Sequence, residues 1–148
     1  MNQIRETKGQ LAAGLVVAPF IATNKMRLFK STFVPSQTST YTDFDAAEVA
    51  FTGYGPFTMA GGYSDGLDAA GNALVMANDL AAFDQTGTGT VDTVGGWFIE
   101  DTAGSKVLLY NSFEAPVSMD TLGNGIRVKA FVELTEESGA DVELIFGP

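Results

Sequence analysis

The chain has 148 residues, enough for one domain with its own core, and it carries a formal net charge of −10. It contains no cysteine and no histidine, which excludes disulfides, thiolate metal sites, cysteine nucleophiles and any mechanism that needs a histidine base or ligand. The acidic balance also argues against nucleic acid as the main partner, because the phosphate backbone repels an acidic protein.

The first thirty residues differ in charge from the rest of the chain. Residues 1–30 hold five basic side chains and one acidic side chain, a net charge of +4, whereas residues 31–148 hold three basic and seventeen acidic side chains, a net charge of −14. A basic leader on an acidic body predicts an N-terminal arm, residues 1–25, that leaves its own domain and binds a negatively charged neighbour. The alternative is that these charges lie by chance on a solvated strand edge.

An apolar stretch over 11–22 lies within this arm. It has the length of a signal-peptide core, but Glu6 interrupts the basic region before it and no clean Ala-x-Ala cleavage site follows. Its roughly twelve residues are too few to span a membrane. We expect an extended segment or short helix that docks on a neighbouring subunit; a signal peptide and an N-terminal core strand are the alternatives. The residues expected to contact the partner are Arg5, Lys8, Leu11, Leu15, Val16, Phe20 and Ile21.

Residues 26–148 have the pattern of an all-β, antiparallel domain. Short runs rich in Val, Phe and Thr alternate with turns rich in Gly, Asn and Asp, which is typical of a sandwich or a barrel, and we favour the sandwich. Residues 43–49 are expected to form a helical turn with Asp43 as its N-cap. The expected loops cover 35–42, 61–72 and 85–90. The expected strands cover 26–30, 51–59, 73–76, 80–83, 96–100, 106–110, 115–119, 126–134 and 142–146.

Three of these segments carry specific expectations. Residues 96–110 read as a hairpin, because an Asp- and Gly-containing turn joins two apolar runs. Residues 126–134 alternate between apolar and mainly polar side chains, which predicts one strand with a buried face and a solvated face. The last segment, 142–146, is expected to pair within the domain or to add to the sheet edge of a neighbour.

Two short segments resemble ligand-binding loops. Asp65, Asp68 and Asn72 supply oxygen atoms in a Gly-rich stretch, which suits a weak Ca²⁺ site, but the EF-hand spacing is absent and an ordinary turn is the preferred interpretation. Gly87 and Gly89 lack the strand-to-helix context of a dinucleotide loop, so we interpret them as a flexible turn. No cofactor and no metal are expected.

Acidic and basic side chains give little support to catalysis. Asp43, Asp45 and Glu48 could serve a glycosidase as a carboxylate pair, but helix-start capping on a solvated face is the preferred interpretation. Lys106 and Lys129 could act as bases only if they were buried, and both lie in ordinary strand positions. The chain is therefore not expected to be an enzyme.

Aromatic residues offer a second binding hypothesis. Trp97, Tyr54, Tyr63 and Tyr110 could form a platform on which a sugar stacks. Trp97 lies in an apolar run and is expected in the core. Tyr54 and Tyr63 lie near predicted loops, and their expected exposure supports carbohydrate binding as the alternative function.

Six passages of turn and core residues lie within the stretch from Met26 to Leu134, about three quarters of the chain: 28–30 followed by Pro35, 42–54 (TDFDAAEVAFTGY), 97–104 (WFIEDTAG), 107–109, 113–117 (FEAPV) and 126–134. Together these passages resemble small phage virion proteins of the capsid decoration, or cement, type. They contain no catalytic signature. The alternative is a virion fibre or a carbohydrate-binding β-sandwich displayed on the virion.

The resemblance implies a structural protein on the outer capsid surface of a bacteriophage virion. It implies a jelly-roll-like sandwich bound over joints between major capsid protein subunits, which it stabilises. We expect a homo-oligomer, with a trimer favoured over a dimer, and no nucleic acid or membrane partner. The resemblance does not cover residues 1–25 or 135–148, so an anchoring role for the arm rests on its charge and apolar pattern alone.

Overall fold

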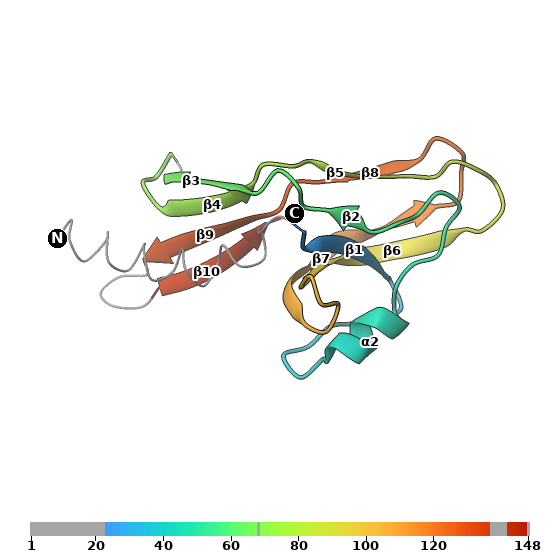
Figure 1. Cartoon of the computed structure of the whole chain (residues 1–148), viewed down its shortest axis with the longest axis horizontal. Helices are drawn as coiled ribbons and strands as arrows, with labels where there is room; N and C mark the ends of the chain where they lie inside the picture. Colours follow the sequence, from blue (N-terminus) through green and yellow to red (C-terminus); the bar gives the residue numbers. More distant parts are fainter. Residues whose placement is uncertain (1–22, 68, 137–141, 148) are drawn as a thin grey trace.

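The computed structural model describes residues 23–67, 69–136 and 142–147 (Figure 1). This part of the chain is antiparallel β structure with one short helix, which confirms the all-β expectation. The elements are β1 (Lys25–Lys30), α2 (Tyr41–Ala46), β2 (Phe57–Thr58), β3 (Tyr63–Leu67), β4 (Ala73–Ala77), β5 (Ala81–Asp84), β6 (Asp92–Glu100), β7 (Val107–Met119), β8 (Gly125–Val128), β9 (Phe131–Glu136) and β10 (Val142–Gly147).

The strands form three sheets. The body sheet has the order β2-β1-β6-β7, the projecting sheet has the order β10-β9-β4-β3, and β5 and β8 form a two-stranded ribbon. Figure 1 shows the ribbon above the body sheet, while the projecting sheet extends away from both toward the left of the view. The described chain is therefore a two-layer body with one sheet that reaches outward.

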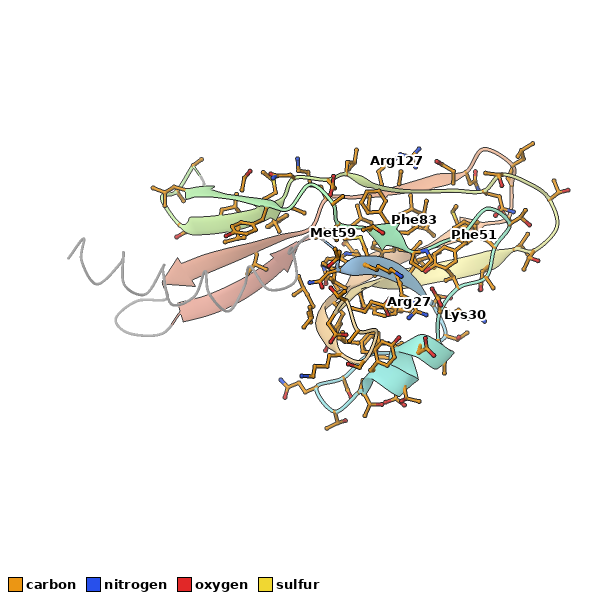
Figure 2. All side chains as sticks on the ribbon, viewed as in Figure 1. Arg27, Lys30, Phe51, Met59, Phe83 and Arg127 are labelled. Atoms are coloured by element: carbon orange, nitrogen blue, oxygen red, sulfur yellow. The ribbon has the colours of Figure 1, made fainter. Side chains whose placement is uncertain are left out.

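The main hydrophobic core lies between the body sheet and the ribbon. Figure 2 shows Phe51, Met59 and Phe83 in the layer between them. Trp97 is fully buried at the centre of the body sheet, where burial of a large aromatic side chain contributes strongly to stability. Further core residues are Met26, Leu28, Val49, Val75, Ala77, Ala81, Val94, Ile99, Leu109, Met119, Ile126, Val128, Ala130 and Val132.

A second, aromatic cluster covers the opposite face of the body sheet. Phe29 and Phe98 point away from the main core and pack around Phe44 of α2. The ring centroids of Phe29 and Phe44 are 5.8 Å apart, and those of Phe44 and Phe98 are 5.1 Å apart. Both faces of β1 are therefore buried, one against the ribbon and the other against α2.

The helix begins two residues earlier than the sequence predicts. Thr40, and not Asp43, is the N-cap, and Asp43 completes a capping box by accepting from the backbone N–H of Thr40 at 2.7 Å. That backbone hydrogen bond, joined by one from the Thr40 hydroxyl, lowers the pKa of Asp43. The expectation that Asp43 caps the helix was wrong because Thr40 provides the same chemistry three residues upstream.

Two continuous stretches of backbone run through both the ribbon and the projecting sheet. β4 leads into β5 and β8 leads into β9, and the backbone N–H of Ala77 donates to Ala130 O at 2.9 Å between them. The single strand expected over 126–134 is thus two strands, although its predicted alternation holds, since Ile126, Val128 and Ala130 are all buried. The break between β8 and β9 lets the same two stretches of backbone contribute strands to two sheets.

Two further expectations about local structure were wrong. The predicted loop 61–72 contains β3, which pairs with β4 around a turn in which Gly71 has φ of 85°. The predicted strand 51–59 is reduced to β2, because Gly53, at φ of 94°, turns the chain where a Cβ would lie 2.8 Å from the Asp84 carbonyl oxygen.

The predicted hairpin is confirmed as β6 and β7. Asp101 closes its turn by accepting from the backbone N–H of Ser105 at 2.8 Å, and this bond lowers the pKa of Asp101. A Cβ at Gly96 would lie 2.3 Å from the Asn111 carbonyl oxygen and 2.4 Å from Phe29 Cζ. Glycine at this position therefore permits close packing of β6 against the next strand and the aromatic cluster.

The segment 85–90, expected to be flexible, is tied to the body. The buried side chain of Gln85 donates to Thr90 O at 3.1 Å, and the backbone N–H of Thr86 donates to Thr52 O at 3.0 Å. The backbone N–H of Thr90 donates to the Thr52 hydroxyl at 2.8 Å. The repeat of Thr and Gly in this segment predicted a flexible backbone. The prediction was wrong because the residue that holds the segment, Thr52, is distant in sequence.

Candidate functional site

The arm residues lie outside the described part of the chain. Arg5, Lys8, Leu11, Leu15, Val16, Phe20 and Ile21 therefore stay predictions from the sequence. Among the described residues, no helix is both long enough and apolar enough to cross a membrane.

Arg27 is the centre of the most extensive polar network among the described residues. It points from β1 to the side of the body sheet that carries α2, and its guanidinium carbon lies 5.3 Å from the ring centroid of Phe98 (Figure 2). Its Nε donates to Glu48 at 2.8 Å and its Nη1 donates to Glu100 at 2.7 Å. Its Nη2 donates to Asp45 at 2.8 Å and also to Glu48.

A further bond from Nη1 to the Tyr41 hydroxyl at 3.0 Å completes the set, so all five guanidinium N–H groups have a partner. The hydrogen bonds to Glu48, with those to Glu100 and Asp45, raise the pKa of Arg27 although burial opposes them. The fixed planar fork of arginine suits this arrangement, in which one cation joins β1, α2 and β6.

The network also answers the glycosidase hypothesis for Asp43, Asp45 and Glu48. Asp45 and Glu48 both bind Arg27, and Asp43 completes the capping box with Thr40 on the exposed side of the helix. Their arrangement holds α2 against the body sheet, which is a structural role.

Tyr54 extends the network into the core. Its hydroxyl donates to Glu48 at 2.7 Å and accepts from the backbone N–H of Leu28 at 3.0 Å. Its ring stacks on Phe83 with centroids 6.0 Å apart. Burial raises the pKa of Tyr54, so folding favours its neutral form.

We expect the free energy of unfolding to fall as the pH rises above 10.0, the ordinary pKa of tyrosine. The folded pKa is raised, so the stabilisation is complete below the unfolded pKa and is lost as the unfolded chain ionises above it. Urea unfolding at a series of alkaline pH values measures this slope. Tyr54→Phe should reduce the slope, and Leu122→Ala, at an exposed residue that does not ionise, should not. An equal slope in both variants would contradict the assignment.

The aromatic platform that could have stacked a sugar is not assembled from these four residues. Trp97 is in the core, as expected, and Tyr110 packs on Phe44 with centroids 5.1 Å apart. Tyr54 was expected to be exposed, and this was wrong, because its ring and its hydroxyl are engaged in the core. Tyr63 alone is exposed, at 42%.

The residues of the possible Ca²⁺ loop lie in and beside the β3–β4 hairpin. Asp65 belongs to β3, Asn72 immediately precedes β4, and Asp68 lies outside the described residues. The described part of the chain holds no group of three or more acidic side chains placed to bind a metal ion.

The projecting sheet offers a surface for a partner. β3 forms one edge of this sheet, and no described strand pairs with its outer side. Its two large apolar side chains, Tyr63 and Leu67, are 42% and 72% exposed and share one face of the strand by their i, i+4 spacing. An edge strand with exposed apolar side chains is suited to pairing with another chain. We call β3 with these two side chains the edge surface.

The two edges of the body sheet are better protected. β7 is at the edge of the body sheet, and its register against β6 shifts between Val94 and Gly96. Residues 113–116 of β7 form a bulge at this shift, and one of them is Pro116. A bulge and a proline both discourage strand addition. β2 has two residues and follows Pro56. β3 has neither device.

A groove forms a second feature, at the end of the body sheet where β1 ends and β6 begins. Its volume is about 310 Å³. Its lining residues are Lys30, Ser31, Thr32, Val91, Asp92, Thr93, Ser118 and Asp120. Sequence reasoning missed this feature, because the lining comes from three segments that no motif connects. It also missed the Arg27 network, whose one sequence signal is a charged residue between apolar neighbours in β1.

Comparison of the chain with protein-family models, with curated proteins and with solved structures finds no match. The resemblance to capsid decoration proteins therefore stays a prediction from the residues quoted above.

Proposed function

We propose that this protein is a bacteriophage capsid decoration protein that binds across major capsid protein subunits on the outer surface of the virion. The single observation that carries the proposal is the edge surface, presented on a sheet that extends away from a two-layer body (Figure 1). A body that rests on one subunit and a sheet that reaches the next would join the two. The acidic charge of residues 31–148 keeps such a protein soluble between binding events.

Stabilisation of the shell follows from mass action. A protein that binds only the assembled lattice shifts the equilibrium toward assembly, and several weak contacts combine into strong binding when they are linked. The basic arm would supply a second contact beside the edge surface. In this proposal the body and ribbon form a jelly-roll-like sandwich, and the protein acts as a homo-oligomer, with a trimer favoured over a dimer.

Co-sedimentation with capsids of the source phage tests the proposal. We expect the full chain to travel with capsids at a fixed ratio and Leu67→Asp to travel at least tenfold less, because a charge at the edge surface opposes apolar contact and strand addition. Leu122→Asp is the matched control, since Leu122 is 60% exposed in the turn between β7 and β8. Absence of binding by the full chain would overturn the proposal.

The arm is tested in the same experiment by a shorter chain. β1 begins at Lys25, so removal of residues 1–22 leaves every described strand complete. If the arm anchors the protein, this variant binds capsids more weakly while its circular dichroism and unfolding transition match those of the full chain. Equal occupancy would remove the arm from the proposal and leave the edge surface as the contact.

A further inference from the structure

The groove at the end of the body sheet combines groups that are held in place with groups that are free to bind. It lies between the end of β1, the start of β6 and the end of β7. Lys30, labelled in Figure 2, lines it from the end of β1. Its volume of about 310 Å³ is at the lower end of the range of roughly 300–1,000 Å³ typical of small-molecule sites. It therefore has room for one small ligand or one unit of a polymer.

Asp92 is the fixed acceptor of the groove. Its Oδ1 accepts from the backbone N–H of Thr93 at 3.0 Å, and its Oδ2 accepts from the backbone N–H of Ala50 at 3.1 Å. The ammonium group of Lys30 lies 3.8 Å from Oδ2. That distance is longer than a hydrogen bond, so the ammonium group retains donor capacity toward a ligand.

Asp120 gives a second acceptor from the other wall. Hydrogen bonds from the side chains of Ser118 and Thr121 lower its pKa, so it is ionised at neutral pH. The turn that carries it is held by Asn124, whose Nδ2 donates to Ser118 O at 3.1 Å. The carboxylate is thus both charged and positioned.

Three hydroxyl groups complete the polar lining. The side-chain hydroxyls of Ser31, Thr32 and Thr93 have no hydrogen-bond partner among the described residues, while the backbone N–H of Ser31 donates to Thr93 O at 2.9 Å. The backbone is therefore fixed and the hydroxyls remain available. Val91, 51% exposed, adds an apolar patch at the rim.

This combination selects the class of ligand. Two carboxylates repel a phosphate or another anion, and the ammonium group of Lys30 opposes a metal cation. An apolar ligand would cover the ammonium group of Lys30 and the three hydroxyls without offering them a hydrogen-bond partner. A neutral polyhydroxylated ligand meets every condition, because each of its hydroxyls can donate to a carboxylate or accept from an ammonium group. Its C–H face can also pack on Val91.

We propose that the groove binds a neutral saccharide unit of a polysaccharide. The open lining has no aromatic ring on which a sugar would stack, so each site binds weakly, and display of many copies on one surface multiplies the effect. The inference does not depend on the edge surface or on the capsid, since the saccharide groove and the edge surface are different parts of the molecule. It gives a polysaccharide-binding role to residues that the tyrosine hypothesis did not include.

Nuclear magnetic resonance titration of the ¹⁵N-labelled full chain tests the inference. The probes are a neutral hexose, a neutral N-acetylhexosamine, inorganic phosphate and calcium chloride, each at millimolar concentration. We expect a neutral sugar to shift the backbone amide signals of Ser31, Thr93 and Ser118, and phosphate and calcium to leave them in place. Shifts at Tyr63 instead, groove shifts caused only by phosphate or calcium, or no shift with either sugar would each overturn the proposal.

Variants assign the binding to individual groups. Asp120→Asn and Thr93→Val keep the size of each side chain but remove a charge-assisted acceptor and a hydroxyl, so we expect each to weaken sugar binding about tenfold. The matched control is Asp84→Asn, an exposed carboxylate on the ribbon, which should bind as the unmodified chain does. Unchanged spectra outside the groove show that each variant is folded, and unchanged affinity in both groove variants would overturn the assignment.

Discussion

Replacing Arg27 with methionine is expected to lower the free energy of unfolding by about 3–5 kcal/mol. The substitution keeps much of the volume but leaves Glu48 and Glu100, with side chains 23% and 8% exposed, without their cation. Removing one partner of a buried ion pair is costly because the remaining charge stays desolvated. Chemical denaturation at neutral pH measures the loss.

A matched control separates burial from charge. Arg127 on β8 also forms an ion pair, with Asp84 at 2.8 Å, but both side chains are about half exposed. Arg127→Met should therefore cost no more than about 1 kcal/mol. Adding Glu48→Gln and Glu100→Gln to Arg27→Met should recover part of the loss, since a neutral network does not need a cation. Equal costs for the two arginine variants would contradict the role given to burial.

Replacing Trp97 with alanine is expected to cost about 3–5 kcal/mol, because the side chain is fully buried at the centre of the main core. Trp97→Phe should cost much less, no more than about 2 kcal/mol. The reason is that the indole N–H of Trp97 is buried without a hydrogen-bond partner among the described residues. Phenylalanine removes that unpaired donor while it retains an aromatic ring in the core.

Thermal and urea unfolding of both Trp97 variants give the comparison. Leu122→Ala, at an exposed site, should stay within about 0.5 kcal/mol of the unmodified chain and serves as the control. If Trp97→Phe costs as much as Trp97→Ala, the indole N–H contributes to stability, and the core at this position is more polar than its neighbours indicate.

The elements that the sequence predicts well are those whose signals are local. The hairpin of β6 and β7 depends on Asp101 and Gly104, which lie between the two strands they join. The alternation from Ile126 to Val132 also needs no distant information. By contrast, β3 was missed because Asp65 and Gly66 are turn formers, and its pairing with β4 overrides that preference.

The sites were harder to predict because their members are far apart in the chain. Arg27 meets Glu48 and Glu100, which lie 21 and 73 residues later. No local pattern states that these three groups share one face of the body sheet. Tyr54 misled the prediction for a related reason: its neighbours Gly53 and Gly55 indicate a loop, but its partners in the core come from β1 and β5.

The backbone continuity between the ribbon and the projecting sheet determines how the molecule would carry a mechanical force. β4 runs into β5 and β8 runs into β9, and the chain also passes from buried Met59 directly to β3. A pull at the tip of the projecting sheet is therefore carried into the core by covalent backbone and not by a side-chain interface that can slip. The sheet behaves as a beam clamped at its root, and its rupture would require strands to be drawn out of the core.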